Sequence, residues 1–405
     1  MALSKETMDI IKATAPVLAE HGTKITTVFY KNMFNENPEL LNIFNKTNQS
    51  RGKQQEALAN MVYQAAVNID RLESIIKDVS LVAHKHRALN ILPEHYPIVG
   101  KHLLEAIKEV LGDAATEDII AAWAETYGVL ADVFINAEED LYKQAEQVDG
   151  GFRGFKDFKV VDKVEESDVI TSFYLKPADG STLPTYDAGQ YLTVRVSPEG
   201  SDFKQIRHYT LSTRPNNEFF RISVKKEADF TPNGVVSCHL HERVNVGDTI
   251  EVSAPAGLFT LVEEDAPVTF ISGGVGITPM VSMLDELAHN KSSRDVTFLH
   301  AAQNEHVHAF HSDVREMLDS LENGTYIYGY DKSVVENSGH DFEGFISKEV
   351  LQDIHKEDMV YYIVGPAPMM AHVANLLIDL GAQEEQINYE LFGPKEEIIK
   401  TEVNV

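Results

Sequence analysis

The strongest constraint on the fold is a change in hydrophobic periodicity near residue 150. Before it, apolar residues recur every three or four positions, which is the period of amphipathic helices. After Gly150 and Gly151, short runs rich in β-branched and aromatic residues are separated by turn residues. From residue 267, such runs alternate with helical stretches, which is typical of a parallel sheet. The sequence therefore predicts three domains: an all-α domain over 1–148, an antiparallel β-barrel over 152–262 and an α/β parallel-sheet domain over 267–405.

The composition excludes several kinds of partner and of structure. The net charge of −28 would repel nucleic acid and anionic membranes, so we expect neither as a partner. The single cysteine, Cys238, excludes an internal disulfide and a cysteine-ligated metal cluster. No apolar run approaches the ~20 residues that span a bilayer, and the N-terminus lacks the apolar core of a signal peptide. We therefore expect a cytoplasmic monomer with no integral membrane segment.

A histidine interrupts an apolar stripe in a predicted helix of the first domain. Val79, Val82 and Ala83 follow helical spacing, and His86 falls on the same face. An imidazole there must find a partner, since an unpaired buried polar group costs about 1–3 kcal/mol. A backbone carbonyl is the ordinary partner of such a core histidine.

Two more polar residues, Tyr96 and Glu138, occupy apolar faces of later predicted helices. A His, a Tyr and a Glu that point inward from three helices predict a buried polar cluster. Metal-ligating histidines are oriented by such partners. We therefore expect His86 to ligate a haem iron, with the ordinary core histidine as the alternative.

Two polar residues upstream, Tyr30 and Gln54, also lie on otherwise apolar faces of predicted helices, and Phe44 lies in the connection between those helices. The residues that share these faces are Thr26, Met33 and Phe34 for Tyr30, and Leu58, Met61 and Val62 for Gln54.

Three stretches of the first domain are NPELLNIFNKTNQSRGKQQEAL, HKHRALNILPEHYPIVGKHLL and WAETYGVLADVFINAEEDLY. Through them, essentially the whole domain resembles the globin domain of the flavohaemoglobins. The resemblance implies that His86 is the proximal iron ligand, whereas His84 lies about 200° away around the helix. It implies these further roles: Tyr96 and Glu138 support the ligand, Lys85 influences the haem redox potential, Tyr30 and Gln54 lie on the distal side, and Phe44 and Leu58 pack on the haem.

In the predicted barrel, the informative string is Ile206-Arg207-His208-Tyr209-Thr210-Leu211-Ser212. Arg207 and Tyr209 face the same way on a strand, and a guanidinium suits a pyrophosphate as a ring suits a flavin. Gly189-Gln190-Tyr191 precedes this string, and Gly234 opens a helix whose N-terminus favours phosphate. Together these segments resemble the FAD-binding barrel of the ferredoxin–NADP reductase family. The FAD contacts implied are Tyr191, Arg207, His208, Tyr209, Thr210, Gly234, Val235, Val236 and Ser237.

In the third domain, a predicted strand runs into the glycine-rich string SGGVGITPM and then into a helix. Thr278 suits the N-cap of that helix and Pro279 its first helical residue. Because Pro279 stands where the third glycine would be, the string is not the Rossmann fingerprint. It resembles instead the nicotinamide-binding domain of the same reductase family. The resemblance implies that the dinucleotide contacts are Ser272, Gly273, Gly274, Val275, Gly276, Ile277 and Thr278.

Near the C-terminus, the string NYELFGP resembles the closing segment of that family. The resemblance implies that Phe392 covers the flavin and that Glu390 influences electron transfer. It also implies cofactor contacts from Leu391, Gly393 and Pro394. The chain departs from the family where Val364 and Leu391 replace cysteines that are common there. The absence of arginine from residues 303–305 favours NADH over NADPH.

Three such modules in one chain imply an electron path from NADH or NADPH through FAD to haem b. A globin that only carries oxygen needs no built-in reductase, whereas an iron that is oxidised at each turnover does. The resemblance implies a nitric oxide dioxygenase, which converts nitric oxide and oxygen into nitrate. Two alternatives stay open: a haem-based oxygen or redox sensor, and an NAD(P)H-dependent peroxide or quinone reductase.

Overall fold

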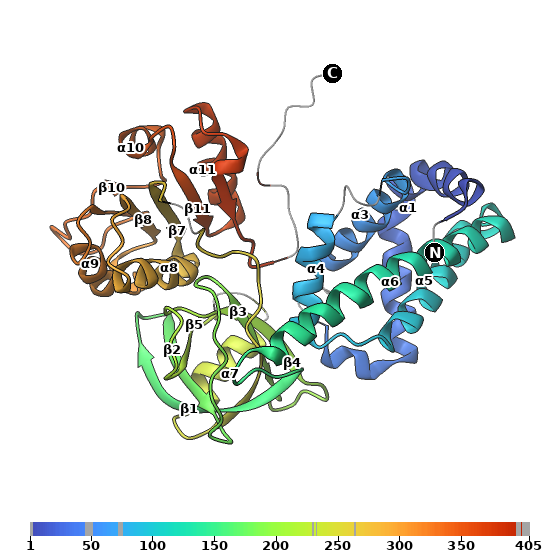
Figure 1. Ribbon diagram of the computed structural model, residues 1–405, viewed down its shortest axis with the longest axis horizontal. Helices are drawn as coiled ribbons and strands as arrows, with labels where there is room; N and C mark the ends of the chain where they lie inside the picture. The colour runs from blue at the N-terminus through green and yellow to red at the C-terminus, as the bar shows by residue number, and fades with distance from the viewer. Residues whose placement is uncertain are drawn as a thin grey trace. The chain divides into compact units, whose positions relative to one another are not determined.

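The computed structural model describes residues 3–44, 52–71, 76–228, 231, 233–262, 265–393 and 398, with backbone alone for 76–78. The chain divides into two compact units, 1–155 with 193–207, and 156–192 with 208–405. Figure 1 labels the helices and strands of both units along the chain. The boundaries of the three predicted domains are a finer division and stay a prediction.

The first unit includes strand residues in its segment 193–207, but its described residues up to 148 form helices, as the 3.6-residue period predicts. Its helices are α1 (Lys5–Glu36), η1 (Pro38–Asn42), α3 (Lys53–Val67), α4 (Ile76–Leu89), α5 (His95–Leu111), η3 (Gly112–Ala114) and α6 (Glu117–Gln147). Side chains cap the two longest helices, since Ser4 Oγ accepts from Thr7 N and Thr116 Oγ1 accepts from Ile119 N. The apolar faces of α1, α5 and α6 meet in one core that contains Phe29, Met33, Leu103 and Trp123.

A glycine lets α5 and α6 approach each other closely beside the predicted cluster. A Cβ at Gly100 would lie 2.5 Å from the Tyr127 ring, which packs against the backbone of α5. The Tyr127 hydroxyl donates a hydrogen bond to Tyr96 O at 2.7 Å. This contact fixes the first turn of α5, which carries Tyr96.

The predicted barrel is present as a six-stranded sheet in the order β4-β3-β6-β1-β2-β5. Its strands are β1 (Phe155–Glu165), β2 (Ile170–Pro177), β3 (Tyr191–Val196), β4 (Gln205–Thr210), β5 (Phe220–Lys225) and β6 (Thr249–Ser253), with α7 (Val235–Arg243) before β6. The pairs β1–β2 and β2–β5 are antiparallel. A bridge between Leu211 and Ile222 connects the end of β4 with β5, so the two edges of the sheet curl toward each other.

The last part of the second unit is a parallel sheet in the order β10-β9-β8-β7-β11-β12. Its strands are β7 (Val268–Gly273), β8 (Val296–Ala302), β9 (Gly324–Tyr330), β10 (Phe342–Glu343), β11 (Val360–Val364) and β12 (Ile387–Tyr389). The helices are η4 (Gly274–Gly276), α8 (Ile277–His289), η5 (Glu305–Val307), α9 (His311–Asp319), α10 (Lys348–Ile354), α11 (Ala367–Asp379) and η6 (Glu384–Gln386).

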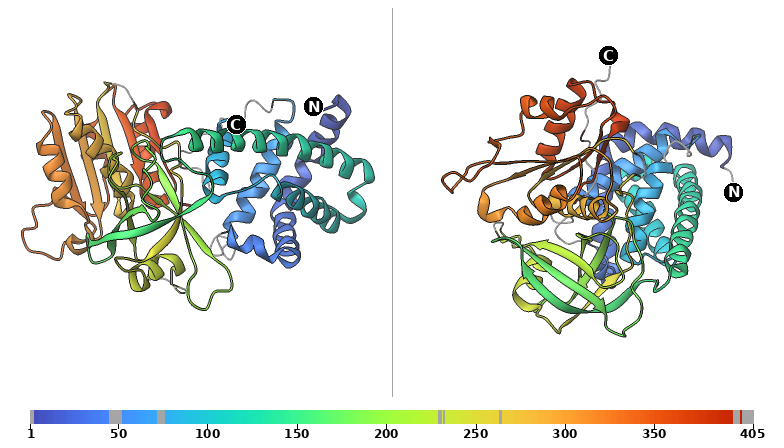
Figure 2. Two further views of the ribbon diagram at one scale, coloured as in Figure 1. Left: turned by 60° about the horizontal axis from the view of Figure 1, so that its bottom comes forward. Right: turned by 60° about the vertical axis from the view of Figure 1, so that its left-hand side comes forward.

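Successive residues of the central strands serve opposite faces of this sheet. Phe270 and Phe298 pack with α8 and α9, whereas Ile271 and Leu299 pack with α10 and α11. The left view of Figure 2 shows the sheet edge-on between the two sets of helices. The first strand, β7, lies in the middle of the sheet. The chain adds β8, β9 and β10 on one side of it and then β11 and β12 on the other, so the strand order reverses at β7. Ligands of such sheets bind at the carboxyl ends of the strands at this switch point, which is where the glycine-rich string lies.

None of the described helices is both long and apolar enough to cross a bilayer. The predicted fold class, with helical, antiparallel and parallel regions in this order, is confirmed by the arrangement of elements.

Two histidines that the sequence analysis did not single out are buried at the carboxyl edge of the parallel sheet. His300 Nδ1 lies 2.8 Å from Ser272 Oγ, and the two nitrogens of His308 lie 3.0 and 2.9 Å from the hydroxyls of Tyr330 and Tyr326. Burial lowers the pKa of His300 to about 3 and that of His308 to about 2, and neighbouring histidines add to both shifts. Both rings are therefore neutral at pH 7.

We expect acid to destabilise the second unit through these rings. In the unfolded chain their pKa returns to about 6.5, so below that pH only the unfolded state takes up protons. The stability present above pH 6.5 is lost as the pH falls, by up to about 2 kcal/mol for each ring at pH 5. Urea unfolding at pH 7.5 and 5.0, followed by circular dichroism, measures this loss. His308→Gln should reduce it, whereas His289→Gln, at the exposed end of α8, should not. Equal losses in the wild type and in His308→Gln would contradict the assignment.

Candidate functional site

The predicted polar cluster forms where α4, α5 and α6 meet. His86 Nδ1 lies 2.7 Å from Glu138 Oε1 and 3.3 Å from the Tyr96 hydroxyl. Tyr96 donates a hydrogen bond to the same carboxylate oxygen at 2.5 Å. Glu138 is 1% exposed. The three residues that the sequence places on separate helices therefore converge on one carboxylate oxygen.

This geometry leaves one nitrogen of His86 for a metal. Both contacts use Nδ1, which donates to the carboxylate, so the lone pair of Nε2 is directed elsewhere. Burial and the hydrogen bond to Glu138 raise the pKa of Tyr96, so the phenol keeps its proton. A histidine oriented by a buried carboxylate is the arrangement found at metal ligands, and these residues fit a haem iron.

Several contacts around the cluster hold the three helices in place. The ring of Phe134 lies 6.0 Å from that of His86. The Tyr142 hydroxyl donates to Ile91 O at 2.8 Å, which ties α6 to the turn between α4 and α5. Lys85 is half-buried beside His86. Burial and the nearby Arg87 lower the pKa of His84, the other candidate ligand, to about 4.

Tyr30 lies in the core of the first unit, among the rings of Phe34 on α1 and of Phe44, which follows η1. Its ring stacks on Phe34 at 5.8 Å and meets Phe44 edge-on at 5.9 Å. Burial raises the pKa of Tyr30, and a hydrogen bond from the Gln54 side chain partly opposes that rise. Among the described residues, the buried Gln54 Oε1 has no hydrogen-bond partner. Such an orphaned acceptor beside a protonated phenol suits a site for a small polar ligand.

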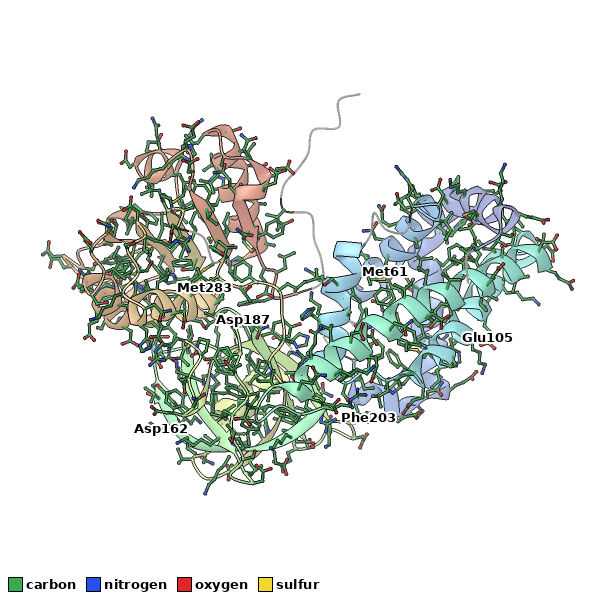
Figure 3. All side chains as sticks on the ribbon, viewed as in Figure 1. Met61, Glu105, Asp162, Asp187, Phe203 and Met283 are labelled. Atoms are coloured by element: carbon green, nitrogen blue, oxygen red, sulfur yellow. The ribbon has the colours of Figure 1, made fainter. Side chains whose placement is uncertain are left out.

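The other residues predicted on these helix faces and in the connection between them differ in how deeply they are buried. Leu58 and Phe44 are half-buried and pack against the core that contains Tyr30. Met61 was expected on the same buried face of α3, but it is 37% exposed (Figure 3). The reason is geometric. At about 100° a residue, Met61 lies about 20° from Gln54 on the side away from Leu58 and Val62, at the margin of the stripe.

The predicted flavin residues on β3 and β4 follow the alternation of a strand only in part. Along β4, Arg207 and Tyr209 are half-buried, His208 is exposed and Thr210 is buried. Arg207 Nη1 donates to Ile206 O at 2.6 Å. The ring of Tyr191, at the start of β3, lies 4.8 Å from that of His208.

Gly234 caps α7, as the sequence predicts. Its nitrogen donates to Glu227 O at 2.7 Å, and a Cβ there would lie 2.6 Å from Ser237 Oγ. Val235 is 43% exposed, whereas the side chain of Val236 is buried at 1%. Any contact of Val236 with a phosphate must therefore come from its backbone.

Within the glycine-rich string, residues Gly274–Gly276 form η4, directly between β7 and α8. Gly274 has φ of 55°, which favours glycine. A Cβ at Gly276 would lie 2.2 Å from Val364 O, so only glycine allows this turn to approach the end of β11. Val275 is half-buried beside it. The backbone is therefore free of side chains where a pyrophosphate would lie.

Two details of this string differ from the prediction. The helix α8 begins at Ile277 with Gly276 as its N-cap, so Thr278 is not the cap and Pro279 is not the first helical residue. The 3-10 turn of η4 already leads into the helix, and Thr278 Oγ1 donates to Val275 O at 3.1 Å instead of capping. Ser272 and Gly273 end β7, and the Ser272 hydroxyl is engaged by His300.

The closing segment follows β12. Glu390 and Leu391 are half-buried, and Leu391 packs against the cluster beneath α11. Phe392 is 54% exposed, and Gly393 is exposed beside it. Pro394 lies outside the described residues. Val364, which replaces a cysteine common in the reductase family, is fully buried at the end of β11.

A group of aromatic and imidazole rings around His308 was not predicted from the sequence. His308 lies within 5.8 Å, ring to ring, of His300, His311, Tyr328 and Tyr330. The alternation in TYIYGY and in HVHAF signals it, because side chains two residues apart share a face of a strand.

Comparisons with known proteins agree with this architecture. Three protein families match in the predicted order: globin over 27–134, oxidoreductase FAD-binding domain over 157–261 and oxidoreductase NAD-binding domain over 270–375. A flavohemoprotein of Halalkalibacterium halodurans is 48% identical over 400 residues, which are 97% of each chain.

Two solved structures are also similar. The crystal structure of a flavohemoglobin from Malassezia yamatoensis, with bound FAD and heme, has a TM-score of 0.84 at 29% identity and covers 97% of this chain and all of that one. The FAD/NAD-binding domain of a nitric oxide dioxygenase from Vibrio cholerae has a TM-score of 0.55 at 37% identity, covering 59% of this chain and 99% of that one. The chain thus belongs to the flavohaemoprotein family, whose oxidoreductase domains follow a globin in one polypeptide.

Proposed function

We propose that this oxidoreductase is a nitric oxide dioxygenase, which converts nitric oxide and oxygen into nitrate with electrons from NADH or NADPH. The observation that carries the proposal is the His86–Glu138–Tyr96 cluster, a metal-ligand arrangement in a chain that also carries reductase domains. The predicted cofactors, haem b, FAD and NAD(P)H, agree with the matched families and with the FAD and heme of the Malassezia structure. The role of each site residue, the monomeric state and the cytoplasmic location stay predictions.

A reductase in the same chain favours a reaction that oxidises the iron at every turnover. Reversible oxygen binding leaves the iron reduced, so an oxygen carrier would offer the reductase no oxidised iron to reduce. The similar domain from Vibrio cholerae is named as part of a nitric oxide dioxygenase, which supports the same reaction here. When bound, haem supplies the redox-active iron, and FAD converts a two-electron hydride into single electrons.

The cluster residues would act on the proximal side. Glu138 accepts a hydrogen bond from Nδ1–H of His86, which makes Nε2 a stronger electron donor to a metal. The protonated Tyr96 donates to the same carboxylate oxygen and holds it in place. The imidazole therefore cannot rotate without breaking its 2.7 Å hydrogen bond to that oxygen.

The residues around Tyr30 would act on the distal side. Burial keeps the Tyr30 phenol protonated, so it can donate a hydrogen bond to a partly negative ligand, worth about 1.5–3 kcal/mol. The Gln54 amide lies beside it and can orient that hydroxyl. The rings of Phe34 and Phe44 keep water away from the phenol.

The first test measures NADH oxidation and nitrate together. Purified protein with bound haem and FAD should consume NADH rapidly only when nitric oxide and oxygen are both present. It should form about two molecules of nitrate for each NADH, because each hydride carries two electrons. A sensor would give no turnover. A peroxide or quinone reductase would oxidise NADH with those acceptors and ignore nitric oxide, and either result would contradict the proposal.

The second test removes the proposed iron ligand. His86→Ala should lose haem or change its absorption spectrum to that of a weakly ligated iron, while FAD stays bound. Added imidazole should restore the spectrum, because the cavity left by the side chain is lined by Glu138 and Tyr96. His84→Ala, on the same helix, is the matched control and should keep the wild-type spectrum. An unchanged spectrum in His86→Ala would exclude this residue as the ligand.

A further inference from the structure

We propose that Ser282 and Asp285 of α8 are positioning residues for hydride transfer. They would hold the nucleotide-binding turn η4 in register with the barrel strands predicted to bind the flavin. This inference rests on the proposed path from NADH to FAD. It concerns contacts within the second unit alone.

The helix α8 can link the nucleotide-binding turn η4 to the barrel because it begins where that turn ends. The helix α8 starts at Ile277, immediately after the glycines of η4. Ser282 and Asp285 are three residues apart, so they lie on the same face of the helix. Ser282 is fully buried and Asp285 is half-buried. A shift of this face would move the start of the helix with it, because a helix is a stiff element.

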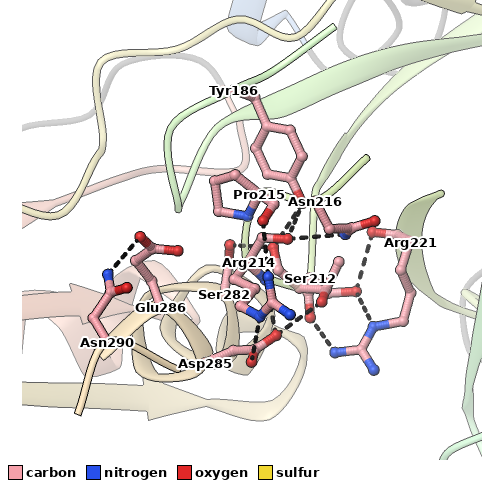
Figure 4. Close-up of polar contacts among 11 residues, drawn as sticks. Tyr186, Ser212, Arg214, Pro215, Asn216, Arg221, Ser282, Asp285, Glu286 and Asn290 are labelled. Atoms are coloured by element: carbon pink, nitrogen blue, oxygen red, sulfur yellow. Dashed lines mark hydrogen bonds and ion pairs between the residues drawn. The ribbon is translucent and has the colours of Figure 1, made fainter. Parts of the chain in front are cut away.

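Asp285 contacts the segment that follows β4. Its Oδ2 accepts hydrogen bonds from Thr213 Oγ1 at 2.8 Å and from Arg214 N at 2.9 Å (Figure 4). Its Oδ1 lies 3.6 Å from Arg214 Nε. Thr213 comes three residues after Thr210, a predicted FAD contact. The carboxylate therefore fixes the end of the flavin strand by two charge-assisted hydrogen bonds.

Ser282 contacts the same segment and a second one. Its hydroxyl donates to Thr213 O at 2.7 Å and accepts from Gly189 N at 3.3 Å. Gly189 lies two residues before Tyr191, another predicted FAD contact. Ser282 therefore connects α8 to the segment before β3 and to the segment after β4, the two strands predicted to bind the flavin.

The backbone at Gly189 shows how closely α8 packs here. A Cβ at Gly189 would lie 2.5 Å from Met283 Cε and 2.3 Å from Phe259 O, and φ at this residue is 104°. Met283 is labelled on α8 in Figure 3. The Tyr186 hydroxyl donates to Thr213 O and Arg214 O, both at 2.8 Å, which closes the network on the barrel side (Figure 4).

The rate of hydride transfer depends on how the nucleotide-binding turn is positioned relative to the predicted flavin strands. The C4–H bond of the dihydronicotinamide breaks, a bond forms at flavin N5, and a proton from water completes the reduced flavin while NADH becomes NAD⁺. The reacting atoms must approach to about 3–3.5 Å, and a misplacement of about 1 Å can cost roughly 100-fold in rate. Contacts that fix α8 against the flavin strands therefore bear on the rate more than on the binding of either nucleotide.

The neighbouring residue Glu286 provides a matched control. It accepts from Asn290 Nδ2 at 2.8 Å within the same helix, and Figure 4 shows this pair beside the Asp285 network. Asp285→Ala and Glu286→Ala each remove one negative charge from α8. Only the first removes contacts with Thr213 and Arg214.

The experiment is anaerobic stopped-flow reduction of the flavin by NADH in the full-length protein with both cofactors bound. Asp285→Ala should lower the limiting reduction rate by about 10- to 100-fold, with the NADH dissociation constant changed less than about threefold. NADH deuterated at C4 should slow the variant at least as much as the wild type, because hydride transfer stays rate-limiting. Glu286→Ala should behave like the wild type, and the haem spectrum should be the same in all three proteins.

Asp285→Asn and Thr213→Val keep the test decisive if Asp285→Ala loses FAD. Each should slow flavin reduction, and the double variant should be less impaired than the product of the two effects, because both remove one hydrogen bond. Equal limiting rates in Asp285→Asn, Glu286→Ala and the wild type would overturn this inference and leave the proposed function standing. A wild-type flavin that NADH does not reduce would overturn the proposed function, and this inference with it.

Discussion

The first unit depends on the burial of one carboxylate, Glu138. At 1% exposure it can be tolerated only with partners, because removing one partner from a buried charge costs about 3–5 kcal/mol. Its partners come from two other helices: Tyr96 on α5 donates to it, and His86 on α4 meets it at 2.7 Å. The arrangement that makes the carboxylate tolerable also orients the imidazole, so the stability and the function of this cluster have the same physical origin.

The sequence predicts this cluster because helical periodicity carries information about direction. His86, Tyr96 and Glu138 each interrupt an apolar stripe, so each must point inward, and inward-pointing polar groups must pair. The convergence on a single oxygen atom could not be predicted, since it depends on how three helices cross. The exposure of Met61 and the start of α8 at Ile277 are local misses of the same kind. Both lie at the edge of a pattern, where a shift of one residue or a short 3-10 turn changes the outcome.

Contacts between distant segments were the least predictable part. Nothing in the string SGGVGITPM indicates that Ser282 and Asp285, which lie two and five residues after its end, make hydrogen bonds with Thr213 and Gly189. The alternation in TYIYGY and HVHAF indicates which rings share a face, but the partners of His300 and His308 become apparent only when β7, β8 and β9 lie side by side. Motifs show which backbone must approach a cofactor, whereas the side chains that hold those motifs in register are dispersed along the chain.

The central claim is that electrons pass from NADH through the flavin to the haem iron within one polypeptide. Anaerobic mixing of the oxidised protein with NADH, followed at flavin and haem wavelengths, tests it most directly. The flavin absorbance should fall first, and the haem should then be reduced at a rate unchanged over about a tenfold range of protein concentration, as expected for a tethered donor. Reduction of the haem before the flavin, or at a rate proportional to protein concentration, would contradict this path.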